Sequence, residues 1–171
     1  MKKLCYDFNL VVHSEPLGLA KTVQDSWRFI PQDIDYILHV EDDFLFNQKP
    51  NLEEIIYILE SHDYLSQMIF MRQPVNFEEQ IAGSYIKQFP DAYTQINLDN
   101  YYWIENNRFF SLNPGLIPRK IFDKYGWPDG NEAEMTAKLN EDGFRHGIWG
   151  KKDDAPIVEH IGVFRPEWWK L

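Results

Sequence analysis

Three consecutive acidic residues, Glu41, Asp42 and Asp43, directly follow a short apolar segment at residues 36–40. Adjacent carboxylates repel one another, and they lose hydration where a buried strand ends. A divalent cation would relieve both costs, because hard cations bind carboxylate oxygens. In open α/β sheets, ligands also bind beyond the carboxyl ends of strands. The segment therefore predicts a metal site, with a solvated acidic turn as the alternative.

A second candidate ligand, His160, lies near the other end of the sequence within the apolar segment 157–162. A neutral imidazole can complete a carboxylate metal site, and Gly162 would allow a close approach by backbone or ligand. The alternative is an ordinary strand histidine. We expect Asp43 and His160 to share one divalent ion.

Glu132 and Glu134 are placed in the first turn of a predicted helix, after the turn at 127–130. The helix dipole favours acids at this position, which needs no catalytic explanation. The same placement would also hold a carboxylate rigidly at the rim of a cleft, as a general base requires. The residues alone leave both interpretations open.

The elements that would position these side chains alternate along the chain. Apolar periodicity, capping pairs and Gly/Pro breaks predict strands at 4–13, 36–40, 67–71, 109–112, 144–149 and 156–161, and helices at 17–29, 51–59, 119–125 and 132–141. This alternation predicts an α/β fold with a mainly parallel sheet. The length of 171 residues fits one domain spanning 1–171.

Composition excludes several classes of function. Lys and Arg number 17 against 27 Asp and Glu, a formal charge of −10, which argues against general nucleic-acid binding and against attachment to anionic membranes. The single cysteine, Cys5, excludes an intrachain disulfide. No apolar run has the length of a membrane span, so we expect a cytoplasmic protein with no transmembrane segment.

Several segments together resemble the GT-A glycosyltransferases, especially the inverting family-2 kind. The similar segments are the strand and acidic motif at 37–43 (a DxD-like motif), the acceptor-side strand and basic pair at 110–120, the helix start at 131–135 with Gly143, the terminal strand at 158–162, and the helix start at 17–21. The resemblance implies an abbreviated, Rossmann-like GT-A three-layer sandwich with a mainly parallel mixed sheet.

The resemblance also implies a role for each matching residue. Asp43 and His160 would bind Mn²⁺ or Mg²⁺, and Glu132 would deprotonate the acceptor hydroxyl. Glu41, Asp42, Gly18 and Lys21 would contact the donor, and Asn113 and Glu134 would lie on the acceptor side. The implied activity is hexosyltransferase-like: transfer of a sugar from a nucleotide-sugar, a UDP-sugar foremost, to a hydroxyl-bearing acceptor.

The sequence departs from this family at its beginning, where residues 4–12 correspond to the family's second strand and no opening β-α unit precedes them. We therefore expect an exposed sheet edge beside residues 10–12, covered by a second copy or a partner chain. Two other functions remain open. One is a non-catalytic binding or assembly module, and the other is a metal-dependent hydrolase that uses Asp42, Asp43, Glu132 and His160.

Overall fold

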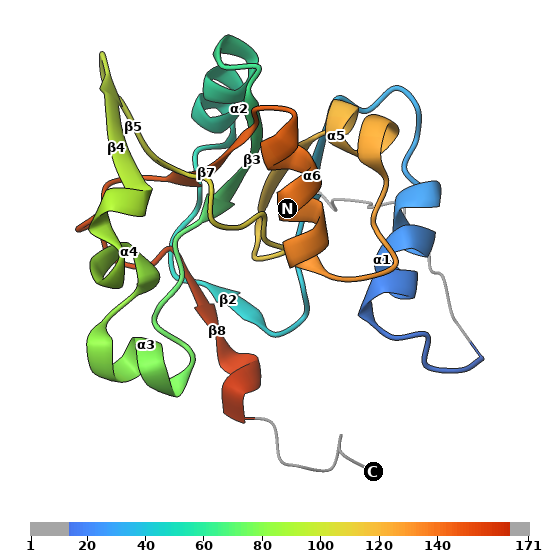
Figure 1. Ribbon diagram of the computed structural model, residues 1–171, viewed down its shortest axis with the longest axis horizontal. Coiled ribbons are helices and arrows are strands. Elements are labelled where there is room, and N and C mark those ends of the chain that lie inside the picture. Colours follow the sequence, from blue (N-terminus) through green and yellow to red (C-terminus); the bar gives the residue numbers. More distant parts are fainter. Residues whose placement is uncertain (1–13, 165–171) are drawn as a thin grey trace, which may run out of the picture.

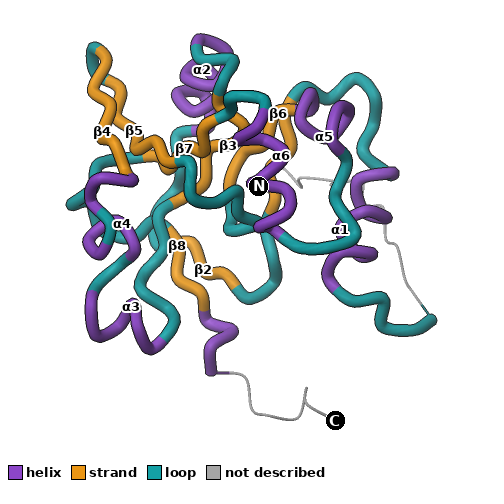
Figure 2. The backbone as a smooth tube through the Cα atoms, in the orientation of Figure 1, coloured by secondary structure: helices purple, strands orange, loops and turns teal. Residues whose placement is uncertain are grey.

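A six-stranded mixed sheet, with the strand order β1-β6-β3-β7-β5-β4, organises the computed structural model, which describes residues 14–164 (Figure 1). A separate two-stranded sheet, β2-β8, lies beside it (Figure 2). The strands are β1 Tyr36–His39, β2 Phe44–Phe46, β3 Leu65–Phe70, β4 Tyr93–Leu98, β5 Tyr101–Asn106, β6 Gly115–Pro118, β7 Arg145–Trp149 and β8 Val158–His160. The helices are α1 Leu19–Arg28, α2 Leu52–Ser61, α3 Phe77–Ala82, α4 Tyr85–Gln88, α5 Arg119–Tyr125 and α6 Glu132–Glu141, with 3₁₀ turns at Pro90–Ala92 and Ile161–Phe164.

The strand directions differ from the prediction of a mainly parallel sheet, which was wrong. Within the six-stranded sheet, β3 and β7 pair in parallel, whereas β1-β6, β3-β6, β5-β7 and β4-β5 are antiparallel. The β4-β5 pair is a tight hairpin whose turn includes Asp99 at φ 53, and a short connection forces its two strands to run in opposite directions. The predicted strand at 109–112 was also wrong, because that segment is a loop and β6 begins only at Gly115.

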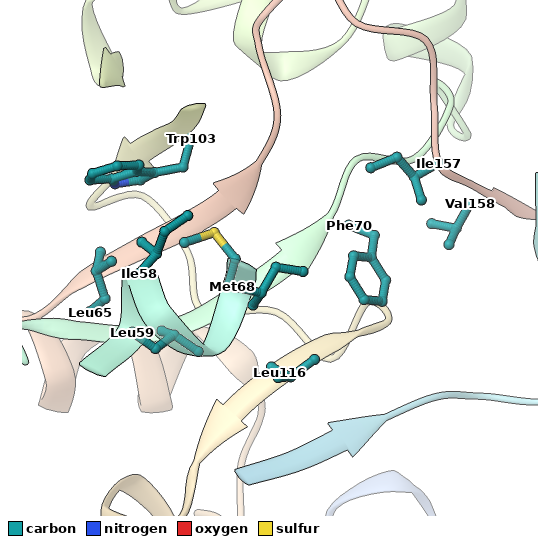
Figure 3. Close-up of a cluster of buried hydrophobic side chains, with 10 residues drawn as sticks. Ile58, Leu59, Leu65, Met68, Phe70, Trp103, Leu116, Ile157 and Val158 are labelled. Atoms are coloured by element: carbon teal, nitrogen blue, oxygen red, sulfur yellow. The ribbon is translucent and has the colours of Figure 1, made fainter. Parts of the chain in front are cut away.

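Alternating side chains bury both faces of the sheet. Met68 and Leu116 belong to a cluster with α2, which also holds Phe70 and Trp103 (Figure 3). Their neighbours Ile69 and Ile117 point to the opposite face, because successive strand residues face opposite ways. On that face Ile117 packs with α1, α5 and α6, and Ile69 packs with α4. The chain therefore has an α/β fold, as predicted, with helices on both faces of the sheet.

Short-range signals explain why several helices begin and end where the sequence predicts. The Asn51 side chain accepts a hydrogen bond from the Glu54 backbone at the start of α2 (3.3 Å), and Asn131 does the same for Ala133 at the start of α6 (2.9 Å). Gly143 follows α6 with φ +83, a left-handed conformation that favours glycine. The predicted bounds of α5 and α6 are confirmed.

The first strand of the described chain differs from its prediction. Residues 36–40 were expected to be buried on both faces, but Leu38 and Val40 are 44% and 45% exposed. Among the described residues, β1 pairs with β6 along one edge alone. The predicted strand at 4–13, and the sheet edge expected beside residues 10–12, lie outside the described residues.

Candidate functional site

A cavity of about 400 Å³ collects most of the residues that the sequence singled out. Its walls include Glu41 from the end of β1, Asn113 from the loop before β6, Glu132 from the start of α6 and His160 from β8. These residues come from segments up to 119 positions apart (160 − 41 = 119). The fold therefore brings four of the predicted site residues to one cavity, which we call the site pocket.

Asp43 and His160, which the sequence predicts to share one ion, lie in direct contact. His160 Nε2 is 3.2 Å from Asp43 Oδ2, and the two side chains are 26% and 19% exposed. The pairing of β2 with β8 produces this contact, because Phe44 lies opposite His160 in the ladder and the Ile161 backbone N–H donates to the Asp43 carbonyl (2.8 Å). The Phe44 ring also packs on the imidazole, with ring centroids 4.7 Å apart.

Gln73, a residue that the sequence did not indicate, fixes the backbone of His160. Its Oε1 accepts a hydrogen bond from His160 N (3.0 Å), and its Nε2 donates to His160 O (3.2 Å). These two bonds satisfy both backbone polar groups of His160 and hold its Cα in place. No local pattern in the sequence could reveal this contact, because the two residues are 87 positions apart.

The Asp43–His160 pair fits a divalent cation that takes further ligands from a substrate. Adjacent ligands of an octahedral ion with bonds of about 2.0–2.1 Å lie about 3 Å apart, close to the observed separation of the pair. The described residues contain no group of three or more His, Cys, Asp or Glu side chains placed to hold a metal. The pair would thus supply at most two ligands. Mg²⁺ commonly binds in this manner, through one or two protein ligands plus substrate phosphates.

Gly162 permits the close approach of the Asp43 side chain, whereas the sequence suggested an approach by backbone or ligand. A Cβ at this position would overlap Asp43 Oδ2 and lie 2.9 Å from Asp43 Cγ and 3.0 Å from its Cβ. Because the aspartate side chain is short, it has little room to move aside. The glycine is therefore part of the geometry that sets the Asp43–His160 contact.

We expect Gly162→Ala to displace the Asp43 carboxylate and to weaken the binding of Mn²⁺, an ion that the sequence predicts at this pair, by about tenfold or more. Isothermal titration calorimetry with Mn²⁺ measures this effect. Gly130→Ala is the matched control, because its Cβ would meet the mobile end of Glu134. Equal affinities for the two variants would show that the close approach at Gly162 does not matter for the site.

Glu132 connects the start of α6 to the loop that precedes β6. Its Oε1 accepts hydrogen bonds from the Leu112 backbone N–H (2.6 Å) and from Ser111 Oγ (3.3 Å). Both bonds end on Oε1, so Oε2 has no hydrogen bond among the described residues. The side chain is held at the wall of the site pocket with one oxygen still able to accept a proton.

Five predicted residues do not line the site pocket, namely Asp43, which contacts His160, and four others. Asp42 and Gly18 are exposed, and Lys21 lines a different cavity, of about 610 Å³, between α1 and α5. Glu134 is exposed and forms an ion pair with Lys138 (3.0 Å). The structure therefore gives no support to donor contacts by Asp42, Gly18 and Lys21, or to an acceptor-side role for Glu134.

Arg72 is a further residue of the site pocket that the sequence did not indicate. Its guanidinium forms a bidentate ion pair with Glu79, with distances of 3.0 Å (Nη1 to Oε2) and 3.3 Å (Nη2 to Oε1). Glu79 is only 3% exposed, and its carboxylate also accepts from the backbone N–H groups of Val75 and Asn76. The ion pair anchors α3 beside the site pocket.

A buried histidine lies outside the site pocket. His146 has no exposed surface, and its Nδ1 lies 2.7 Å from Ser66 Oγ. Its buried Nε2 has no hydrogen-bond partner among the described residues. Burial, with a smaller contribution from the positive charge of Arg145, lowers the pKa of His146 to about 4.

Acid should therefore destabilise the protein through His146. In the unfolded chain this histidine binds a proton below pH of about 6.5, whereas the folded state resists protonation down to about 4. The unfolded state binds more protons in this window, so the free energy of unfolding should fall by about 2 kcal/mol between pH 7 and pH 5. Urea unfolding at several pH values measures the slope, and His146→Gln should flatten it. An unchanged slope in this variant would assign the acid sensitivity to other groups.

None of the models of known protein families matches this sequence, and a search of curated proteins finds no match. Within residues 14–164, no helix has both the length and the apolar character needed to cross a bilayer.

Proposed function

We propose that this protein is a metal-dependent glycosyltransferase that moves a sugar from a nucleotide-sugar, foremost a UDP-sugar, to a hydroxyl acceptor with inversion. One observation carries the proposal. A carboxylate with an available oxygen, Glu132, and the imidazole of His160 line one pocket from segments far apart in the sequence, and Asp43 contacts that imidazole. A general base beside a site for a metal and a diphosphate is the arrangement that this reaction requires.

In the proposed reaction, Glu132 accepts the proton of the acceptor hydroxyl. The hydroxyl oxygen then forms a bond to the anomeric carbon while the bond from that carbon to the diphosphate oxygen breaks, and the nucleoside diphosphate leaves with the electron pair. The hydrogen bonds from Leu112 and Ser111 hold Glu132 in position for this transfer. Bound Mn²⁺ or Mg²⁺, held by Asp43 and His160, would neutralise charge on the diphosphate.

The two other functions are affected differently by the geometry. A hydrolase with a catalytic zinc would need about three protein ligands around its ion, and the described part of the chain contains no such group. The structure therefore disfavours it. A non-catalytic binding module would use the same pocket to hold a ligand without sugar transfer.

A thermal-shift experiment separates the transferase from the binding module. The protein is heated with each of a panel of nucleoside diphosphates, with and without Mn²⁺. We expect one nucleotide to raise the melting temperature by several degrees at a concentration of about 100 times its Kd, and only when Mn²⁺ is present. Stabilisation that does not depend on the metal, or no stabilisation by any nucleotide, would contradict the proposal. Transfer from the matching nucleotide-sugar is then measured directly.

A further inference from the structure

Arg72 is the one arginine or lysine among the described residues that line the site pocket. The other charged groups there are the carboxylates of Glu41 and Glu132, and Asp43 lies behind His160. A phosphorylated or carboxylated substrate would meet repulsion from these acids unless a cation faced it. The arginine side chain is 21% exposed, so part of it remains accessible.

The ion pair with Glu79 uses only one edge of the guanidinium. Glu79 contacts Nη1 and Nη2, the two terminal nitrogens, and Nη1 also donates to the Gln73 carbonyl (2.8 Å). An arginine has five N–H donors, of which these bonds use three. The N–H of Nε and the second N–H of Nη2 have no acceptor among the described residues.

The two remaining donors lie side by side on the second edge of the guanidinium. This edge presents two parallel N–H groups, a geometry that matches two oxygens of a carboxylate or a phosphate. Glu79 prevents the planar group from rotating, because it is buried and its carboxylate also accepts from two backbone N–H groups. Arg72 is therefore a preorganised donor pair at the pocket wall.

A smaller cavity of about 50 Å³ adjoins this part of the wall and shares Arg72, Tyr85, Phe109 and Asn113 with the site pocket. Tyr85 Oη accepts a hydrogen bond from Asn76 Nδ2 (3.1 Å), so the hydroxyl is oriented by the segment that Glu79 anchors. Arg72, Tyr85 and Asn113 thus line both cavities, and Asn113 is a residue that the resemblance places on the acceptor side.

We propose that the second edge of Arg72 binds an anionic group of the substrate, a phosphate or a carboxylate. The identity of the substrate rests on the proposed function, whereas the binding of an anion by Arg72 does not. The anion has two sources, the diphosphate of the donor and an acid group on the acceptor, such as a hexuronate or a sugar phosphate. Arg72 selects for substrates that carry such a group.

The test compares the affinities of Arg72→Lys and the wild type for charged and neutral probes by isothermal titration calorimetry. Lysine keeps the charge next to Glu79 but loses the paired donors, so we expect binding of the anionic probe to weaken by about 10–100-fold. One arm uses UDP with Mn²⁺, and the other uses glucuronate and glucose 6-phosphate against glucose. A loss in the first arm assigns the anion to the donor, and a loss in the second assigns it to the acceptor.

Arg28→Gln is the matched control, because Arg28 is largely exposed and lies outside the site pocket. Should Arg72→Lys fail to fold, the double variant Arg72→Met with Glu79→Gln replaces it, since no unpaired charge is then buried. Affinities within about twofold of the wild type for every anionic probe would overturn the inference, as would a wild type that binds none of them. Anion binding that depends on Arg72 without any sugar transfer would overturn only the proposed function.

Discussion

Replacing Glu132 by glutamine should lower the rate of sugar transfer by about 10²–10⁴-fold and leave nucleotide binding nearly unchanged. Glutamine has almost the same size and keeps an oxygen that can accept from Leu112 and Ser111, so the loop and α6 stay connected. The amide cannot take the proton of the acceptor hydroxyl. The measurements are kcat with saturating donor and acceptor, and the Kd for UDP with Mn²⁺.

The control for this prediction is Glu134→Gln. Glu134 is in the same turn of α6, is exposed and pairs with Lys138, so its replacement should leave transfer unchanged.

Glu132→Ala should also lose both hydrogen bonds to the loop and reduce stability by about 1–3 kcal/mol. Full transfer activity in Glu132→Gln would show that another residue is the base, and Glu132 would then be a structural link between α6 and the loop.

Asp43→Asn should weaken metal-dependent nucleotide binding, and sugar transfer should fall as a consequence. The amide is a weaker metal ligand than a carboxylate. Mutating a residue that only supports a metal ligand already lowers metal affinity by about 10–100-fold. We therefore expect Mn²⁺-dependent UDP binding to weaken by about 100-fold or more. The Phe44–His160 pairing and the Gln73 bonds do not involve the Asp43 side chain, and His160 should keep its position. Titration of UDP at several Mn²⁺ concentrations measures the effect.

The adjacent residue provides the control for Asp43. Asp42 is exposed and does not line the site pocket, so Asp42→Asn removes the same charge one position away. The Asp42→Asn variant should change the affinity for UDP with Mn²⁺ by about twofold or less. If Asp42→Asn and Asp43→Asn weaken binding equally, the acidic segment acts through its net charge and the assignment of Asp43 as a ligand is wrong.

The sequence predicted well the features that depend on neighbouring residues. The starts of α2 and α6 follow from the asparagine caps, and the end of α6 follows from Gly143. The contact between Asp43 and His160 was also predicted, because acidic and imidazole groups each lay at an apolar strand. Residue types that commonly bind metals can be recognised in a sequence, even when the strand pairing that brings them together cannot.

The strand directions and much of the pocket wall could not be predicted in this way. The antiparallel insertion of β6 between β1 and β3 depends on pairings with strands that precede it by about 45 to 80 residues, and no local pattern encodes such a pairing. Gln73 acts through a contact 87 positions away, whereas Arg72 pairs with Glu79 only 7 positions away but reaches a pocket whose other walls come from distant segments. Glu134 illustrates another limit, since residues two apart on a helix point about 200° away from one another.

The position of β6 has a consequence for how the chain folds during synthesis. β1 and β3 do not pair with each other, and β6 joins them only after residues 115–118 have been made. The site needs a still later segment, because His160 arrives with β8. While a ribosome synthesises the chain, β1 and β3 have unpaired edges until β6 is made, which invites aggregation or chaperone binding. The pocket itself forms only when nearly all of the described residues have emerged.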